Sequence, residues 1–178
     1  MGLFKRNPAK QLVKAGDVEG LLSLADSSDE SERADALNAL PALEGAMTPE
    51  QRASSRGVMT SALSDSSPDV RGQALFALWE TEGGGAVERV IGGLGDPDVG
   101  VRCLAAAMLG GGDPSVATDP LIASLQDGEP VVRQSAADSL GALGDRRAEA
   151  PLDKVASDDP EAEVRAAARS ALDQLGAG

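Results

Sequence analysis

The stretch that decides the fold is Asp127-Gly128-Glu129-Pro130-Val131-Val132-Arg133, followed by Ala136, Leu140 and Gly141. The chain repeats this phrase, and the opening aspartates of its last four copies stand at positions 65, 96, 127 and 158, a constant step of 31. A looser first copy runs from Asp26 to Arg33. Self-similarity at this period predicts stacked supersecondary units, each of which contacts only its neighbours.

Each unit is predicted to be a helix, a turn and a second helix. The first helices are expected at about 17–26, 48–64, 86–95, 115–126 and 146–156. Prolines at 68, 130 and 160 suit the start of a second helix, where the missing N–H costs nothing. Asp98 and Ser28 are the expected caps of two others, and Gly141 or Gly144 is the expected end of the fourth. Because no stretch alternates like a strand, the fold class is predicted to be all-α.

The domain organisation predicted from this pattern is a single domain, 1–178, with repeats at about 17–45, 46–83, 84–112, 113–144 and 145–178. Residues 1–16 differ from the rest, since they contain Lys5, Arg6, Lys10 and Lys14 and no acidic residue. We interpret this segment as a helix that caps the open end of the stack, as solenoids require. The alternative is a basic docking element for an acidic partner or a membrane surface.

A helical projection of the second helices places one buried stripe and one arginine per repeat. The residues one before, three after and seven after the arginine span about 80° and should be buried. The arginine lies at the border of that stripe, where a partly buried guanidinium needs a carboxylate or carbonyl partner. The aspartate in the turn just before each helix is the predicted partner, and it is also expected to accept turn N–H groups and to join adjacent repeats. The structural ladder predicted in this way consists of Asp65, Arg71, Asp96, Arg102, Asp127, Arg133, Asp158 and Arg165.

The phrase Asp-x-x-Pro-x-Val-Arg-x-x-Ala-x-x-x-Leu-Gly resembles HEAT repeats, specifically the short variety called phycobilisome-lyase-like HEAT repeats. The resemblance covers nearly the whole chain after residue 16, although Glu32 replaces the valine in the first copy. It implies a right-handed α-α superhelix of about five two-helix repeats, with the second helices on the concave side. Members of this family act mostly as scaffolds, adaptors and regulatory subunits.

Composition limits the partners that the protein can bind. The sequence has 16 basic and 29 acidic residues, a net charge of −13, which repels nucleic acid and anionic lipid. Cys103 is the only cysteine, so no internal disulfide is possible. No segment resembles a signal peptide or a membrane span. We therefore expect a cytoplasmic monomer that binds neither membrane nor nucleic acid.

The charge balance also suggests a source. Abundant acidic residues with few large apolar groups suit a protein that stays soluble in very high salt, where self-repulsion is screened. We interpret the sequence as that of a halophilic archaeon.

Catalysis is not predicted. The sequence has no histidine, which removes histidine-based metal sites, catalytic triads and the usual general base near neutral pH. Deoxyhypusine hydroxylase resembles this architecture but holds two irons with histidine–glutamate pairs, which cannot exist here. We expect no metal and no cofactor. The bilin lyases after which the repeats are named act in pairs on a pigment, and no residue pattern here marks a pigment pocket.

Partner binding is the predicted function. Positions one, two, five, eight and nine after the arginine face away from the buried stripe. In the second repeat they are Gly72, Gln73, Phe76, Trp79 and Glu80, which places the two aromatic residues together. Aromatic anchors in a polar groove are typical of interface hot spots; the alternative is that Trp79 packs over the joint between repeats. The predicted partner-binding residues are Gln73, Phe76, Trp79, Glu80, Leu104, Ser135 and Asp138. We predict a non-catalytic scaffold or adaptor that binds a protein, or alternatively a lyase-like or regulatory subunit of an enzyme complex.

Overall fold

The computed structural model describes residues 7–176, so Lys5 and Arg6 of the basic segment lie outside the described residues. Within this range every regular element is helical, which confirms the all-α class. The chain forms two compact units, Met1–Gly83 and Gly84–Gly178.

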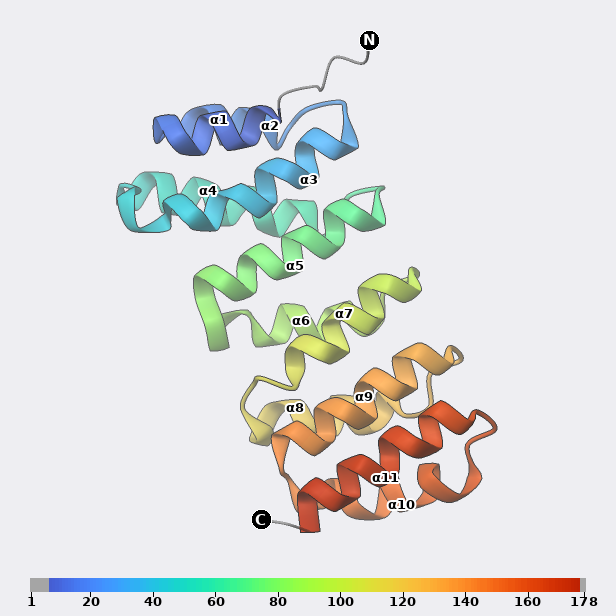
Figure 1. Cartoon of the computed structure of the whole chain (residues 1–178). Helices are drawn as coiled ribbons and strands as arrows, with labels where there is room; N and C mark the ends of the chain where they lie inside the picture. Colours follow the sequence, from blue (N-terminus) through green and yellow to red (C-terminus); the bar gives the residue numbers. More distant parts are fainter. Residues whose placement is uncertain (1–6, 177–178) are drawn as a thin grey trace. The chain divides into compact units, whose positions relative to one another are not determined.

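The first unit contains α1 (Pro8–Ala15), α2 (Val18–Leu24), α3 (Glu30–Ala39), α4 (Pro49–Ala62) and α5 (Pro68–Glu82), with a 3-10 helix at Leu40–Ala46. The second helices α3 and α5 lie side by side, and each packs against the first helix before it (Figure 1). The helix α1 packs against both α2 and α3. Asn7 caps α1, and Gly16 ends it in the left-handed conformation that glycine tolerates best.

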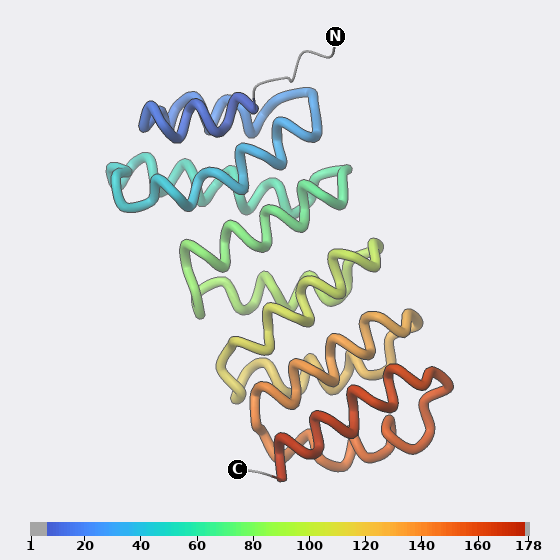
Figure 2. Tube along the Cα trace, in the orientation of Figure 1, coloured from blue at the N-terminus to red at the C-terminus, as the bar shows by residue number. Residues whose placement is uncertain are grey.

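The second unit contains α6 (Val87–Gly93), α7 (Val99–Leu109), α8 (Pro114–Ser124), α9 (Pro130–Leu143), α10 (Glu149–Asp158) and α11 (Ala162–Gly176). Short 3-10 helices at Gly83–Ala86 and Arg146–Ala148 precede α6 and α10. The second helices α7, α9 and α11 pack in succession, and their traces run next to one another in Figure 2. The first helices α6, α8 and α10 form the other layer against them.

The core is built from leucine, valine and alanine, as the shortage of aromatic residues requires. The predicted stripe is fully buried in α9, where Val132, Ala136 and Leu140 have no exposed surface. The corresponding residues of α5 are buried in the same way. Small alanines at the centre of the stripe let neighbouring helices approach closely.

The helix ends agree with the prediction at some positions and differ at others. Asp98 caps α7 as expected, its carboxylate accepting hydrogen bonds from the N–H groups of Gly100 and Val101. The cap of α3 is Asp29 and not Ser28, because the Asp29 carboxylate accepts from the N–H of Ser31 at 2.9 Å. The helix α9 ends at Gly144, with a φ of 70°, and Gly141 lies inside it.

Candidate partner-binding faces and the arginine ladder

The arginine of each second helix first fastens the turn that precedes its own helix. Arg102 donates from Nη1 to the carbonyl oxygen of Asp96 at 3.0 Å, and Arg133 donates to that of Asp127 at 2.9 Å. Every acceptor lies six residues before its arginine. The same bond joins Arg33 to Ser27, Arg71 to Asp65, and Arg165 to Asp159. Each arginine therefore satisfies a turn carbonyl that the helix itself leaves open.

The carboxylate partner comes from the following repeat, which corrects the predicted pairing within one phrase. Arg102 binds Asp127 in a bidentate manner, with Nε to Oδ2 at 2.8 Å and Nη2 to Oδ1 at 3.0 Å. Arg133 and Arg33 form the same fork with Asp159 and Asp65. The extended guanidinium reaches past its own turn, so one arginine joins two consecutive repeats. Two parallel hydrogen bonds also fix the register of the two helix pairs.

The last acidic rung is Asp159, whereas the sequence prediction named Asp158. Asp158 is the last residue of α10 and is exposed. Asp159 lies six residues before Arg165, as Asp127 does before Arg133, and its side chain is only 5% exposed. The prediction of Asp158 assumed a constant step of 31 residues from Asp127. The aspartate that lies six residues before the repeat arginine is the correct rung, and in the last repeat that residue is Asp159.

The rung carboxylates also organise their own turns. Asp127 accepts the N–H of Glu129 at 2.9 Å, and Asp159 accepts that of Glu161 at 3.0 Å. Asp65 and Asp96 accept turn N–H groups two residues on in the same way. The hydrogen-bonded guanidinium of Arg133 lowers the pKa of Asp159, and Arg102 and Arg33 lower the pKa values of Asp127 and Asp65. These rungs use both oxygens internally, which is the arrangement of a structural tie.

Four predicted binding residues lie on α5, and we call them the α5 face: Gln73, Phe76, Trp79 and Glu80. The Phe76 side chain is 39% exposed, which is unusual for a residue of this size. Glu80 is exposed, while Gln73 and Trp79 are half-buried. The structure thus presents one aromatic ring to solvent, with the second three residues further along the same helix.

The other predicted binding residues, Leu104, Ser135 and Asp138, lie on α7 and α9 of the second unit. The Ser135 hydroxyl donates to the carbonyl oxygen of Cys103 at 3.2 Å and so joins the two helices. Asp138 is an exposed residue, yet partial desolvation of its carboxyl raises its pKa. Leu104 is half-buried beside Cys103. The predicted residues therefore divide between the two units.

Sequence reasoning missed Val131, which is 49% exposed on α9. It stands two residues before Arg133, a position that projects to the same side of the helix as Asp138. The thiol of Cys103 on α7 lies 3.9 Å from the Val131 carbonyl oxygen, which places both at the same joint. The sequence could have indicated this residue, because Val131 is a large apolar side chain that the helical projection places outside the buried stripe. We call Leu104, Val131, Ser135 and Asp138 the α7–α9 face.

Residues 7–176 contain neither a metal-binding cluster nor a membrane-spanning helix. No group of three or more cysteine, aspartate or glutamate side chains is arranged to hold a metal ion in that range. None of the helices described there is both long and apolar enough to cross a membrane.

Comparison with known proteins agrees with this architecture. Residues 87–173 match the family model of HEAT repeats. Deoxyhypusine hydroxylase-B of Oryza sativa subsp. japonica is 36% identical over 104 residues, which are 57% of this chain and 34% of that protein. The chain therefore spans about a third of the length of this curated relative.

Solved structures show the same fold at low identity. A chain of the CpcE and CpcF complex of phycocyanin lyase from Nostoc has a TM-score of 0.66 at 20% identity, covering 88% of this chain and 98% of that one. Human deoxyhypusine hydroxylase has a TM-score of 0.60 at 22% identity, over 97% and 78% of the two chains. A designed armadillo repeat protein in complex with the peptide (KR)4 has 0.61 at 21%, over 94% and 85%. These likenesses show the fold of the chain, and the match to HEAT repeats extends over residues 87–173.

Proposed function

We propose that this protein is a non-catalytic adaptor that binds another protein through the outward faces of its second helices, with the α5 face as the main anchor. The observation that carries the proposal is the exposure of Phe76. The whole sequence has three aromatic residues, and two of them stand on this helix three residues apart. Large rings surrounded by polar residues are the groups that contribute most to protein interfaces.

The α7–α9 face supports the same function with a different chemistry. Val131 offers apolar surface, and Asp138 is a carboxylate that has lost part of its hydration. A partner that places a basic side chain opposite Asp138 would restore the lost electrostatic stabilisation. The designed armadillo repeat protein with a similar fold was solved with a peptide of alternating lysine and arginine. We propose that the partner segment on this face is basic.

The non-catalytic part of the proposal rests on composition. Without a histidine, the chain has no side chain whose ordinary pKa lies near neutral pH. Three of the recurring arginines, Arg33, Arg102 and Arg133, form salt bridges with an aspartate of the following repeat. The residues that remain on the outward faces are suited to contact a surface and not to transfer a group.

The proposal can be tested through Trp79, which is the only tryptophan and therefore reports on the α5 face alone. A protein recovered by affinity purification is titrated into the purified chain while Trp79 emission is recorded. We expect the emission to shift on binding, and Phe76→Ala to weaken binding by about tenfold or more, since hot-spot truncation costs at least about 1–2 kcal/mol.

The matched control is Val116→Ala, which removes a side chain of similar exposure, 40%, from the first helix α8. This variant should bind like the unmodified protein. If Phe76→Ala lowers the melting temperature strongly and leaves the affinity unchanged, the ring is a packing residue and the α5 face is not the binding surface.

A second candidate function is that of a lyase-like or regulatory subunit of an enzyme complex. The observation in its favour is the likeness to a chain of the phycocyanin lyase complex, which extends over 98% of that chain. Such a subunit would carry or contact a small molecule. Native mass spectrometry and visible absorbance of the purified protein distinguish the two, because a bound pigment adds mass and colour that an adaptor lacks.

A further inference from the structure

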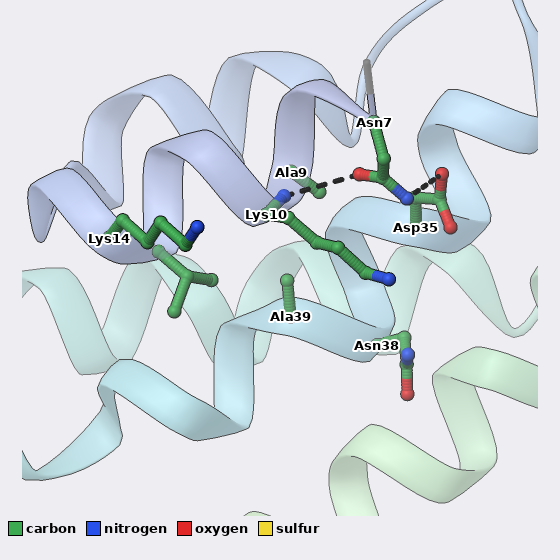
Figure 3. A pocket seen from close by; sticks show the side chains of 8 residues that line it. Asn7, Ala9, Lys10, Lys14, Asp35, Asn38 and Ala39 are labelled. Carbon is green, nitrogen blue, oxygen red and sulfur yellow. Dashed lines mark hydrogen bonds between the residues drawn. The ribbon is translucent and has the colours of Figure 1, made fainter. Parts of the chain in front are cut away.

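A hollow of about 370 Å³ lies between α1 and α3 in the first unit (Figure 3). Its apolar lining comes from Ala9, Val13 and Ala39. Ala9 is 2% exposed, so this side of α1 packs closely against α2 and α3. The hollow therefore lies between two helices that pack against each other.

Two lysines stand at the edge of the hollow. Lys10 and Lys14 are four residues apart on α1 and hence on one side of the helix. Both are exposed, and both are drawn beside the hollow in Figure 3. Among residues 7–176, neither ammonium group has a carboxylate within salt-bridge distance. Their charge is available to a ligand.

The opposite wall is polar, and its one carboxylate is already engaged. Asn7 donates from Nδ2 to Asp35 Oδ2 at 2.7 Å, and its Oδ1 accepts the N–H of Lys10 at 3.2 Å (Figure 3). One side chain thus caps α1 and fastens its start to α3. Asn38 completes this wall and is exposed. Because the Asn7 amide is neutral, Asp35 keeps its negative charge; Lys10 and Lys14 outweigh it, so the net charge at the hollow is positive.

The charge of the rest of the chain makes this location distinctive. Residues 1–16 contain four basic and no acidic residues, a charge of +4, whereas the remainder contains 12 basic and 29 acidic residues, a charge of −17. An anionic partner is repelled by the remainder and attracted here, so the field itself selects the site. A broad anionic surface such as a membrane would also approach the acidic remainder of the chain and be repelled by it. A single inserted acidic side chain avoids most of that repulsion.

We propose that this hollow receives an acidic segment of a partner protein, with a glutamate or aspartate carboxylate between Lys10 and Lys14. The methylene groups of the inserted side chain would lie over Val13 and Ala39. This inference rests on the proposed adaptor function and names the chemistry of one part of the partner. Asn38 on α3 and Phe76 on α5 both stand five residues after their repeat arginines, so the hollow adjoins the row that holds the α5 face.

The experiment uses a fluorescein-labelled oligoglutamate peptide and measures anisotropy with the full chain. We expect the peptide to bind, while oligoglutamine and oligolysine peptides do not bind at this hollow. The Lys10→Glu/Lys14→Glu variant should lose affinity by about tenfold or more, because two surface ion pairs contribute about 1–2 kcal/mol together. Molar salt should weaken the binding of the unmodified protein.

The matched control for a single exchange is Lys154→Glu, which makes the same charge change as Lys10→Glu but on α10 of the second unit. Equal affinity of Lys154→Glu and Lys10→Glu would overturn the site, since net charge would then explain the effect. A second variant, Ala39→Leu, fills the hollow without a change of charge and should also weaken binding. If it does not, no side chain enters the hollow and the proposal is wrong.

Two further outcomes separate this inference from its alternatives. If sedimentation shows a dimer that the double lysine variant abolishes, the occupant is a second copy of the chain and the proposal of a foreign acidic segment fails. Oligoglutamate binding should survive Phe76→Ala, so the inference can fail while the adaptor function stands. Conversely, loss of partner binding at Phe76 with no role for the lysines would support the adaptor function alone.

Discussion

At the scale of single residues, Arg133 shows how one side chain joins two repeats. It donates to the carbonyl oxygen of Asp127 behind it and forms a bidentate salt bridge with Asp159 ahead of it. Its side chain is only 10% exposed. If Arg133 were removed, water could therefore replace few of the hydrogen bonds that it makes to Asp127 and Asp159. A buried pair of this kind is costly to break on one side only, because the remaining charge stays buried without a partner.

We therefore predict that Arg133→Ala lowers the free energy of unfolding by about 3 kcal/mol at neutral pH. The Arg133→Ala/Asp159→Ala double variant should lose less than the sum of the single variants, since it leaves no unpaired charge. Asp158→Ala is the matched control and should change stability by less than about 0.5 kcal/mol, because that carboxylate is exposed. Chemical denaturation at constant salt is measured for the unmodified protein, Arg133→Ala, Asp159→Ala, the double variant and Asp158→Ala.

The same pair predicts a pH dependence. The pKa of Asp159 is lower in the folded state than in the unfolded chain, so its contribution is present above the unfolded value and is lost as the pH falls through the folded one. The stability difference between the unmodified protein and Arg133→Ala should therefore shrink below about pH 4. A difference that stayed constant from neutral to strongly acidic pH would show that Asp159 is not the partner that matters.

At the scale of elements, the contact between α9 and α11 depends on a glycine inside a helix. A Cβ at Gly141 would lie 2.9 Å from the Ala171 Cα of α11, closer than such atoms approach. The obstacle is backbone, so the two helices would have to separate. Gly110 at the end of α7 faces Ser139 of α9 in the same way, with a Cβ 2.9 Å from the hydroxyl oxygen. The Leu-Gly pair in the repeated phrase therefore sets the spacing of second helices.

We predict that Gly141→Ala destabilises the protein by about 2 kcal/mol through overpacking, although alanine has the higher helix propensity. Gly57 on α4 is the matched control, because a Cβ there would meet nothing within 4 Å. Gly57→Ala should stabilise the protein by about 0.5 kcal/mol. Thermal unfolding followed by circular dichroism compares the two; equal and positive shifts would disprove the close-packing role of Gly141.

At the scale of the whole molecule, charge is the dominant property. The net charge of −13 on 178 residues opposes compaction, and dissolved salt screens that repulsion. We propose that the protein is adapted to high salt, because its acidic composition suits a solution in which charge repulsion is screened.

We predict that the denaturation midpoint rises from low salt to molar potassium chloride. A neutral osmolyte at equal osmolality should stabilise the protein less, because it excludes itself from the surface without screening charge. Measurement of the midpoint in both series separates the two effects. A midpoint that did not rise with salt would remove the halophilic interpretation.

The features that could be predicted from the sequence are those that depend on interactions between residues close together in the chain. Helix positions, the buried stripe at Val132, Ala136 and Leu140, and the all-α class depend on contacts within a few residues, which the periodicity records directly. The outward position of Phe76 follows from the same helical projection. The repeat also showed that arginines and aspartates recur together. These features were determined by the amino-acid sequence alone.

Which groups meet across helices was decided only by the tertiary structure. Arg102 pairs with Asp127 of the next repeat because the distance between helix pairs matches the reach of an arginine, a distance that no local pattern encodes. The close approach at Gly141 and the hollow beside Lys10 arise in the same way, from the separation of packed helices. Sequence periodicity specifies the direction of each side chain, and packing then specifies what lies in that direction.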